Sequence, residues 1–397
     1  MDDKVDTSTK SKVAFATGSR ADYGIVRRYL KLLNDDPAID LSILVTGALL
    51  EQAYGYQVDI VKEDGFSIGI EIPLGIDSLS EVGVARSMAR ALEGFSVHFA
   101  DNKYDLLIIL GDRYEMLSVA TAAAMQRIPI LHIHGGEATF ANYDEFIRHA
   151  ITKMSLYHFT ATEEYRRRVI QLGEEPNRVF NLGALGAENC LVTDFGKSPS
   201  YPLPQRDYFV VLFHPETMST ADPLAQTQEL LGAISELEDY DYVFIGSNAD
   251  THSDVVRAAV QDFVASNENA HYCENLRTRD YHHLVQHARA LVGNSSSGLI
   301  EAPSLGVCTI NIGHRQDGRV RGKSVLDVKC LKDEIAIALK RAGSMPAPDP
   351  LDNPYYQPQT AEKYHEKTRE ILNRVANNTS MTKVFWDIPM EGFLDSK

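Results

Sequence analysis

Side chains that can take up or release a proton concentrate in the first half of the chain, where acidic residues follow apolar runs. The candidates are Asp112, Glu137, Asp144, Glu145 and Arg148. Asp112 comes directly after one apolar run, and Glu137 follows the next one at the end of the string HIHGGE. A carboxylate at the carboxyl end of a buried strand, inside a cleft, suits general acid–base chemistry. The pattern therefore predicts a proton-transfer site whose base is a buried carboxylate with a raised pKa.

Several of these acids also have a purely structural interpretation. Aspartate is a preferred N-cap, so Asp112 could cap the helix expected after it, and it could do both jobs. Asp144 and Glu145 could equally be charges at the N-terminus of a helix. Glu137 follows two glycines, where the backbone can approach a ligand closely.

The histidines of the chain are weaker signals. His132 and His134 stand two residues apart, so on a strand both would face the same side. No third ligand accompanies them at a recognisable spacing, so we expect no metal site and at least one histidine packed and hydrogen-bonded in the core. In the second half, Pro215 keeps His214 out of helical geometry and at the mouth of a cleft, although a lone histidine there also has a structural interpretation.

Small and basic residues in the second half indicate an anion site. Ser295 and Ser296 lie in the run GNSSSGLIEAP, where a strand is expected to turn into a helix. Exposed N–H groups, hydroxyls and a helix dipole would together cradle a phosphate there. Glu301 lies one helical turn further on, where it could accept hydrogen bonds from sugar hydroxyls. Arg319 belongs to three arginines in the run HRQDGRVR, and Arg20 follows the glycine turn of TGSR, so we expect a diphosphate at this mouth.

An α/β rhythm positions these side chains. Strands are expected at 13–17, 41–45, 106–110, 128–133, 157–160 and 178–182 in the first half, and at 208–213, 242–245, 290–292 and 309–312 in the second. Helical patterns are expected at 23–33, 114–125 and 360–376. Buried strands that alternate with helices predict parallel sheets covered on both faces.

The chain divides at an irregular stretch rich in proline and serine. Residues 195–206, FGKSPSYPLPQR, are expected to link two domains. The expected domains are an α/β unit at 12–194 with the proton-transfer acids and a second one at 207–358 with the anion site. A final helix, 359–380, is expected to pack back on the first domain. A cleft between two open α/β domains is the natural place for a ligand.

Bulk properties exclude several classes of protein. The length of 397 residues favours two domains over one. A net charge of −16 argues against a nucleic-acid or membrane partner, since either would need a basic surface. The four cysteines include no C-x-x-C pair, which suits a reducing compartment. The polar start of the chain and the lack of an apolar run of roughly 18 residues predict a cytoplasmic protein.

Eight motifs in chain order carry a family resemblance. They read TGSRADYG, LGDRYE, HIHGGE, YDEFIRHAITKM, FHPET, IGSNAD, GNSSSGLIEAPSLG and GHRQDGRVRG. Together they resemble the hydrolysing UDP-N-acetylglucosamine 2-epimerases, in particular those of bacterial sialic-acid biosynthesis. The likeness runs from about Lys12 to the C-terminal helix, and eight motifs in one order are highly specific.

This resemblance implies an α/β GT-B fold, with two doubly wound Rossmann-like domains and the active site between them. The UDP-sugar-binding positions that it implies are Arg20, His214, Asn248, Asp250, Ser295, Ser296, Glu301 and Arg319. The catalytic positions that it implies are Asp112, Glu137, Asp144, Glu145, Arg148 and His214. Many relatives carry Glu where this chain has His134, and we favour Glu137 as the carboxylate that takes that role.

The implied reaction converts UDP-N-acetylglucosamine and water to UDP and free N-acetylmannosamine, without a cofactor or a metal. It would proceed by elimination to 2-acetamidoglucal and hydration from the opposite face. Alternatives are a hydrolysing enzyme for a UDP-2,4-diacetamido-2,4,6-trideoxyhexose of legionaminic-acid pathways, a non-hydrolysing epimerase and a non-catalytic UDP-sugar sensor. The dense carboxylates argue against a glycosyltransferase. The family leads us to expect a homodimer or homotetramer.

Overall fold

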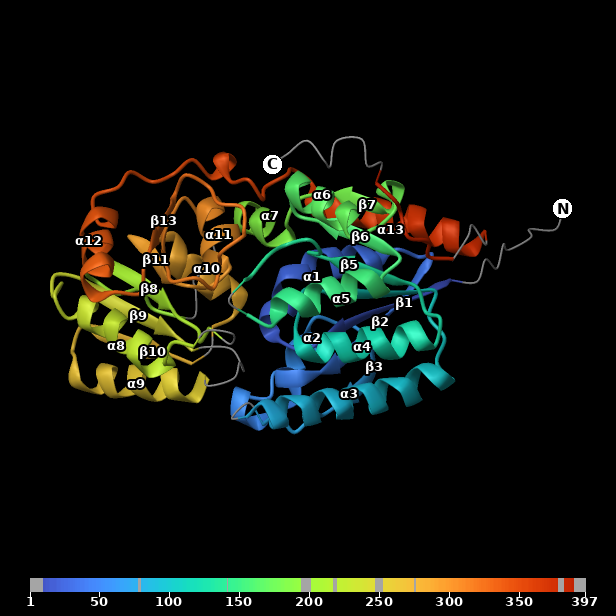
Figure 1. Ribbon diagram of the computed structural model, residues 1–397, viewed down its shortest axis with the longest axis horizontal. Coiled ribbons are helices and arrows are strands. Elements are labelled where there is room, and N and C mark those ends of the chain that lie inside the picture. Colours follow the sequence, from blue (N-terminus) through green and yellow to red (C-terminus); the bar gives the residue numbers. More distant parts are fainter. Residues whose placement is uncertain are drawn as a thin grey trace.

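The computed structural model describes residues 10–77, 80–140, 142–193, 201–216, 220–246, 253–274, 276–377 and 382–388. These residues form two α/β domains that lie side by side, each built on a parallel sheet with its own hydrophobic core (Figure 1). The expected fold class, two doubly wound Rossmann-like units, is therefore confirmed.

The first domain is built on a seven-stranded sheet of order β3-β2-β1-β4-β5-β6-β7, in which every pairing is parallel. Its strands are β1 (Ser11–Thr17), β2 (Ile39–Thr46), β3 (Ile68–Ile72), β4 (Leu106–Leu110), β5 (Ile130–Ile133), β6 (Tyr157–Thr160) and β7 (Val179–Asn181). The central strand β4 reads LLIIL and is buried throughout, as a parallel strand covered on both faces should be.

Helices cover both faces of this sheet. They are α1 (Arg20–Asp35), α2 (Asp59–Glu63), α3 (Glu81–Asp101), α4 (Tyr114–Met125), α5 (Asp144–Met154), α6 (Glu163–Gln171), α7 (Leu185–Val192) and, from the end of the chain, α13 (Thr360–Ala376). Short 3₁₀ turns are η1 (Gly47–Leu50), η2 (Gln52–Tyr54) and η3 (Pro176–Arg178). Apolar side chains of α1, α2 and α13 share one core with the strands, and those of α3, α4 and α5 share the core on the opposite face.

The second domain has a six-stranded parallel sheet of order β10-β9-β8-β11-β12-β13. Its strands are β8 (Tyr208–Leu212), β9 (Asp241–Ile245), β10 (Ala270–Cys273), β11 (Ala290–Gly293), β12 (Cys308–Ile312) and β13 (Val325–Val328). Its helices are α8 (Pro223–Ile234), α9 (Ser253–Ser266), α10 (Thr278–Gln286), α11 (Ser297–Ile300) and α12 (Lys332–Ala342), with 3₁₀ turns η4 (Ala302–Leu305) and η5 (Pro350–Asp352). Helices α8, α9 and α12 pack on one face, and α10 and η4 on the other.

The last helix ties the end of the chain to the first domain. The ring of Tyr364 on α13 packs edge-on against Tyr29 of α1, with centroids 5.5 Å apart. The carboxylate of Glu188 on α7 accepts hydrogen bonds from the first backbone N–H groups of α13, those of Thr360 (2.8 Å) and Ala361 (3.0 Å). An acidic side chain at this end also complements the helix dipole. We propose 12–194, 207–358 and 359–380 as the working division of the chain.

A further contact holds residues 382–388 on the first domain. Lys383 donates hydrogen bonds to the backbone at the end of α5 and lies 2.6 Å from Glu174. Glu174 also pairs with Lys153 (2.7 Å) and with the buried His158 (3.1 Å). Burial by itself would raise the pKa of Glu174, but His158 and the two lysines outweigh it and lower that pKa to about 2. This carboxylate therefore stays ionised at the centre of a basic cluster.

The predicted strands are all present, within about two residues at each end. Three strands were not predicted, namely β3, β10 and β13. Each is an edge strand with at most one buried residue, so it lacks the continuous apolar run that marks a central strand. Of the expected linker, residues 195–200 lie outside the described residues, and 201–206 lead into β8.

Candidate functional site

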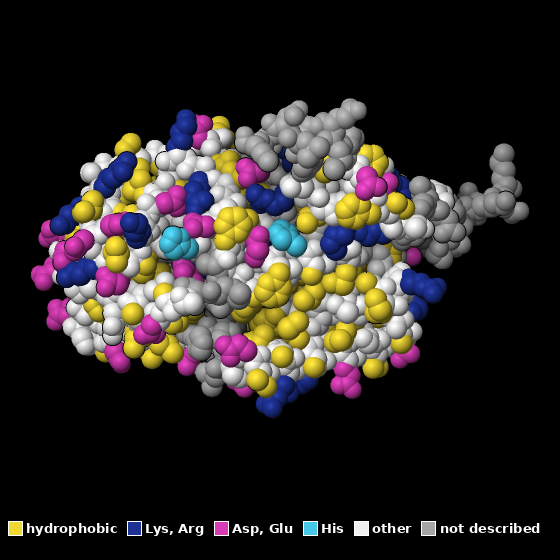
Figure 2. All heavy atoms as spheres, in the orientation of Figure 1, with side chains coloured by type: hydrophobic (Ala, Val, Ile, Leu, Met, Phe, Trp, Pro, Cys, Tyr) yellow, Lys and Arg dark blue, Asp and Glu magenta, His cyan; other side chains and the backbone are white. Residues whose placement is uncertain are grey.

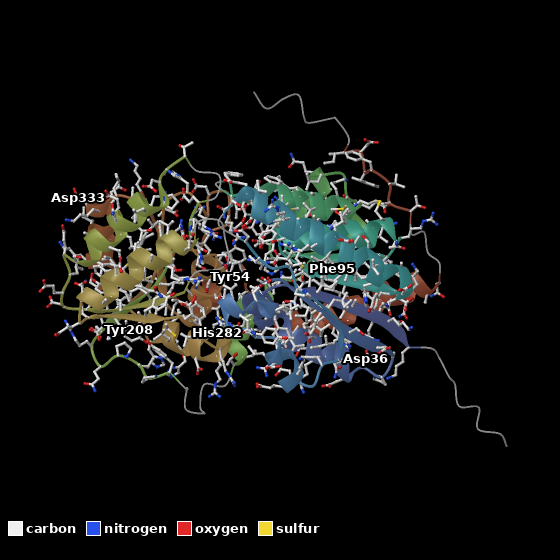
Figure 3. The ribbon with its side chains drawn as sticks, turned by 90° about the horizontal axis from the view of Figure 1, so that it is seen from below. Asp36, Tyr54, Phe95, Tyr208, His282 and Asp333 are labelled. Atoms are coloured by element: carbon white, nitrogen blue, oxygen red, sulfur yellow. The ribbon has the colours of Figure 1, made fainter. Side chains whose placement is uncertain are left out.

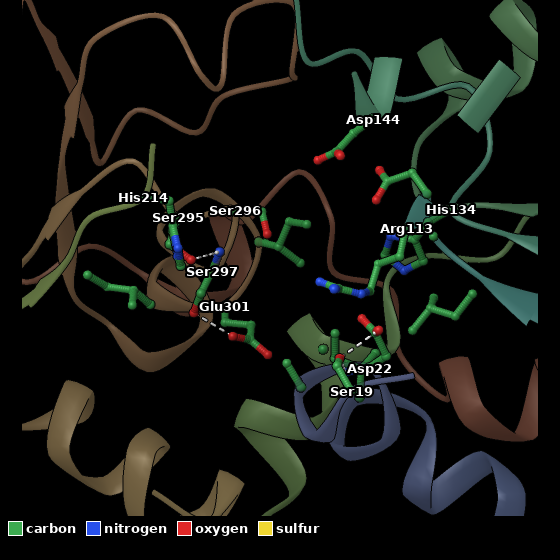
Figure 4. A pocket seen from close by; sticks show the side chains of 18 of the residues that line it. Ser19, Asp22, Arg113, His134, Asp144, His214, Ser295, Ser296, Ser297 and Glu301 are labelled. Carbon is green, nitrogen blue, oxygen red and sulfur yellow. Dashed lines mark hydrogen bonds between the residues drawn. The ribbon is translucent and has the colours of Figure 1, made fainter. Parts of the chain in front are cut away.

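A pocket lies between the two domains, at the carboxyl ends of both sheets (Figure 4). Segments that follow β1, β4 and β5 line its first wall, and segments that follow β8, β9, β10, β11 and β12 line the second. Seen from below, Tyr54 and His282 lie where the domains meet (Figure 3). The guanidinium of Arg257 on α9 stands 5.8 Å from the Tyr54 ring, so the domains touch beside the pocket.

Arg148 organises the first wall. It is completely buried on α5 and forms an ion pair with Asp112 at the end of β4. It also donates to the backbone oxygen of Glu137 (3.0 Å), to Thr139 Oγ1 (3.0 Å) and to Glu145 Oε2 (3.4 Å). Although burial would raise the pKa of Asp112, the Arg148 charge lowers it overall. The N-cap interpretation of Asp112 is wrong, because α4 begins after Arg113 and has no side-chain cap.

Glu137 is the most strongly held carboxylate of the pocket. It is buried, it accepts a hydrogen bond from His134 Nδ1 (2.7 Å), and its Oε2 lies 2.9 Å from Arg319 Nη2 of the second domain. Burial by itself would raise the pKa of Glu137, but Arg319, His134 and Arg148 outweigh it and lower that pKa to about 2. The expectation of a raised pKa is therefore wrong for Glu137, which an opposite charge keeps ionised.

Asp144 and Glu145 take different places. Both lie in the first turn of α5, in agreement with the helix-terminus interpretation, but only Asp144 lines the pocket (Figure 4). Glu145 Oε2 accepts the backbone N–H of Thr139 at 2.6 Å, and its other oxygen lies 3.1 Å from His149. These partners and Arg148 outweigh burial and lower the pKa of Glu145. The structure thus brings Asp144 to the cavity and uses Glu145 to brace the loop behind it.

The two histidines of HIHGGE do not face the same side, so that expectation is wrong. Strand β5 ends at Ile133, and His134 has a φ of +67°. His132 is fully buried between Gly111 O (2.7 Å) and Thr152 Oγ1 (3.0 Å), and burial lowers its pKa to about 3. It is the packed core histidine that was predicted. His134 lines the pocket, and its Nε2 is buried without a hydrogen-bond partner among the described residues.

The second wall is centred on the turn after β11. Ser295 and Ser296 line the pocket there, and α11 that follows is only four residues long. Gly293 has a φ of +137°, and a Cβ at this position would collide with the Leu212 carbonyl oxygen of the neighbouring strand β8. Only glycine fits at this position, and its lack of a side chain allows β8 and the serine turn to approach each other closely.

Asn294 joins this turn to the segment that carries His214. Its side chain accepts the N–H of His214 (2.7 Å) and donates to the carbonyl oxygen of the same residue (2.8 Å). His214 is buried and lines the pocket beside the serines, as predicted (Figure 4). Sequence reasoning missed the role of Asn294, since an asparagine in a small-residue turn has no distinctive spacing.

Glu301 lies beside the serine turn, deep in the pocket. Its carboxylate accepts a hydrogen bond from Ser297 Oγ (2.5 Å) and lies 3.5 Å from His282 Nε2. Tyr281 in turn lies 2.8 Å from Ser297 Oγ. Burial would raise the pKa of Glu301, but His282 and Ser297 lower it overall, so an ionised acceptor faces the cavity.

The arginines divide between the walls. Arg20 and Arg315 line the pocket, and Arg319 reaches across it to Glu137. Arg321 instead turns toward Asp317 and Asp327 and is absent from the lining, so the expectation of three arginines at one mouth holds for two.

Among the residues of the quoted motifs that line the pocket without an assigned role, two are charged, Asp22 and Arg113. Burial raises the pKa of Asp22 to about 6, although Arg113 and a hydrogen bond from Ser19 Oγ (2.7 Å) act against it. Arg113 donates through Nε to the fully buried Glu115 (2.6 Å). Asp22 and Arg113 belong to the motifs TGSRADYG and LGDRYE, so the sequence did point to their neighbourhood. A motif does not show which of its side chains faces the pocket.

Other expectations concern absences or lie outside the structure. Asn248 and Asp250 are outside the described residues. Within the described ranges, no group of three or more His, Cys, Asp or Glu residues could hold a metal ion. Across the same part of the chain, no helix combines the length and apolar character that a bilayer crossing needs.

Comparisons with known proteins agree on one family. The sequence model of the family described as UDP-N-acetylglucosamine 2-epimerase matches residues 31–369. Polysialic acid biosynthesis protein P7 of Escherichia coli is 45% identical over 386 residues, which cover 95% of this chain and 98% of the relative. A protein of Campylobacter jejuni named GDP/UDP-N,N'-diacetylbacillosamine 2-epimerase (hydrolyzing) is 34% identical, over 80% of this chain and 84% of its own length.

A solved structure supports the fold. The crystal structure of UDP-GlcNAc 2-epimerase from Neisseria meningitidis bound to UDP-GlcNAc superposes with a TM-score of 0.74 and covers 90% of this chain and all of that one. Sequence identity in this superposition is 16%, so the likeness concerns the arrangement of the two domains.

Proposed function

The chain belongs to the UDP-N-acetylglucosamine 2-epimerase family, and on that premise we propose that it is a hydrolysing 2-epimerase, which converts UDP-N-acetylglucosamine and water to N-acetylmannosamine and UDP. One observation carries the proposal, namely a single pocket with two unlike walls. Ionised carboxylates line one wall, and a serine turn with buried arginines lines the other. A reaction that removes a proton from one carbon and expels a diphosphate from its neighbour needs both.

The second wall suits the departing nucleotide. The hydroxyls of Ser295 and Ser296 and the guanidinium groups of Arg315 and Arg319 line it, and Arg20 adds a third guanidinium from the first wall. Arginine binds phosphate oxygens through two parallel N–H groups and stays charged when buried. We assign Glu301 to the sugar hydroxyls of the nucleotide, because it is an ionised acceptor beside the serine turn.

The first wall suits the proton transfers. We propose that Asp112, Glu137 and Asp144 share them, with Arg148 as the residue that positions the set. In the first step the C2–H bond breaks as a carboxylate takes the proton, and the C1–O bond breaks as UDP leaves, which gives 2-acetamidoglucal. In the second step water adds its oxygen to C1 while C2 takes a proton on the opposite face, which yields the manno configuration.

The polysialic acid name of the Escherichia coli relative supports this product, because N-acetylmannosamine is the sugar from which sialic acid is built. The Campylobacter jejuni relative favours a second candidate substrate, a UDP-2,4-diacetamido-2,4,6-trideoxyhexose, for the same two steps. The two substrates differ at C4 and C6 of the sugar, whereas the chemistry takes place at C1 and C2.

We also propose that the protein is a homodimer or homotetramer. Hydrophobic side chains gather on the face of the first domain over α4 and α5 (Figure 2). Val97, Met125 and Phe146 on helices α3, α4 and α5 are each more than half exposed. Exposed apolar patches of this kind commonly mark protein interfaces. Light scattering coupled to size-exclusion chromatography measures the oligomeric state directly, and a monomer would refute this part of the proposal.

Proton NMR in deuterated water tests the reaction. With UDP-N-acetylglucosamine we expect UDP and N-acetylmannosamine that carries deuterium at C2. Consumption of only the 2,4-diacetamido substrate would select the second candidate, and formation of UDP-N-acetylmannosamine would show a non-hydrolysing epimerase. No turnover of either substrate, with UDP still bound in a calorimetric titration, would show a sensor.

A further inference from the structure

The loop after β12 carries Arg319 across to Glu137, and contacts from outside its own domain help to hold it in place. Its neighbour Val320 makes two backbone hydrogen bonds to tyrosine side chains. Val320 N donates to Tyr165 OH (2.9 Å), and Tyr355 OH donates to Val320 O (2.8 Å). The two tyrosine oxygens are 2.7 Å apart.

These contacts fix the direction of every hydrogen bond. The only proton of Tyr355 OH goes to Val320 O, so Tyr355 must accept the proton of Tyr165 OH. Tyr165 OH in turn accepts the proton of Val320 N. The three residues therefore form a closed ring in which each hydroxyl donates once and accepts once, and in which both backbone groups of Val320 are satisfied.

Three parts of the fold meet in this ring. Tyr165 belongs to α6 of the first domain, Val320 to the loop after β12 of the second, and Tyr355 to the segment that leads back to α13. Both tyrosines are completely buried, and neither lines the pocket. A buried ring of neutral hydrogen bonds holds its members more rigidly than exposed pairs do, because no water competes for them.

Arg319, which directly precedes Val320 of the ring, links the two walls of the pocket. The side chain of Arg319 is 8% exposed and uses Nη2 for Glu137, while its buried Nε and Nη1 have no hydrogen-bond partner within the part of the chain that the structure describes. A buried guanidinium with spare N–H groups at a pocket is poised for an anion. Arg319 thus stands between the carboxylate and the expected place of the diphosphate.

We propose that Tyr165 and Tyr355 are positioning residues that hold Arg319 opposite Glu137 across the domain boundary, and so govern turnover more than nucleotide binding. This inference rests on the proposed function for its kinetic consequence. The ring tyrosines share an apolar cluster with Leu299 and Ile300 of α11, but their hydroxyls bond each other and Val320 and not the serine turn. Loss of a ring hydroxyl therefore leaves the serine hydroxyls in place.

The test compares Tyr165→Phe and Tyr355→Phe with Tyr29→Phe as the matched control. Tyr29 is an equally buried tyrosine whose hydroxyl bonds Thr368 Oγ1 at 2.7 Å, and it belongs to a different hydrophobic core from the ring tyrosines. Each ring variant should lower kcat about fivefold, the effect of one lost hydrogen bond, while the UDP dissociation constant changes less than about twofold. The acidic limb of the kcat profile should also move to higher pH, because a displaced Arg319 no longer favours the ionised form of Glu137.

Amide hydrogen exchange gives a readout that does not depend on turnover. The amide of Val320 should exchange faster in Tyr165→Phe, which removes its acceptor, and keep the wild-type rate in Tyr29→Phe. If the ring variants match Tyr29→Phe in kcat, in pH profile and in exchange, the positioning role is refuted. If the wild type turns over no UDP-sugar, the proposed function fails, and the exchange rates alone still decide whether the ring holds the loop.

Discussion

The change of Glu137 to glutamine is the sharpest test of the proton-transfer site, because it removes a charge and almost nothing else. Glutamine has nearly the same shape as glutamate and can still accept the hydrogen bond from His134. It cannot take a proton from C2. A general base contributes about 10²- to 10⁴-fold to a rate, so we expect kcat to fall about a thousandfold, or roughly 4 kcal/mol in the barrier.

Nucleotide binding should respond differently in this variant. Arg319 loses its carboxylate partner at 2.9 Å, and its full positive charge becomes available to the diphosphate. We therefore expect Glu137→Gln to bind UDP at least as tightly as the wild type does. A parallel loss of UDP binding would show that the Glu137–Arg319 pair serves only to hold the domains together.

Release of UDP followed by chromatography and binding followed by calorimetry give the two quantities. Glu145→Gln is the matched control, since Glu145 is a nearby acid that braces the Thr139 backbone and does not line the pocket. It should retain kcat to within about tenfold, the effect of one weakened charged hydrogen bond. A Glu137→Gln enzyme as active as this control would refute the assignment of Glu137.

Three further predictions concern the frame of the site. Arg148→Lys leaves most of the four hydrogen-bond partners of the buried guanidinium unsatisfied, so urea denaturation should show that the free energy of unfolding falls by about 3 kcal/mol. An unchanged free energy of unfolding would contradict the central place of Arg148. Gly24→Ala puts a Cβ against Thr278 Oγ1 of the other domain, so it should push the two domains apart and raise KM about tenfold. The double variant Gly24→Ala/Thr278→Ala should recover the wild-type KM, and an equally impaired double variant would exclude this steric explanation. Because the pKa of Glu174 is depressed to about 2 in the folded state, its ionised form stabilises the fold fully above pH 4.5, and this stabilisation is lost as the pH falls from there toward 2. We put the contribution to the free energy of unfolding at roughly 2 kcal/mol after allowing for screening by solvent. Unfolding curves of Glu174→Gln should lack this pH dependence.

Much of the fold follows from short-range patterns in the sequence. Continuous apolar runs such as LLIIL at 106–110 mark the central strands, and the structure places β4 at the same residues. The helices at 114–125 and 360–376 also have their predicted limits. Three of the four edge strands, β3, β10 and β13, escape the same reasoning, because each is mostly exposed or partly exposed and has no continuous apolar run.

Individual positions in the site are less predictable than the site itself. The sequence indicates that a carboxylate wall and a serine turn exist, since each depends on residues close together in the chain. It does not indicate that Asp144 faces the cavity while Glu145 turns away, because that choice depends on the Thr139 backbone folding over the start of α5. Contacts between domains are harder still to predict from the sequence, because their partners lie far apart in the chain. Val320 and Tyr165, which share a hydrogen bond, are 155 residues apart.

The charge of the protein illustrates how local geometry overrides composition. A net charge of −16 would repel an anionic ligand if it were spread evenly, yet Arg20, Arg113, Arg315 and Arg319 all face one cavity. Fields from distant surface carboxylates are screened by salt within about 10 Å, whereas buried or partly buried charges are screened much less. The ligand therefore meets the field of these arginines and not that of the whole molecule. By the same argument, raising the ionic strength should weaken UDP binding only slightly, because the groups proposed to bind it are buried or partly buried.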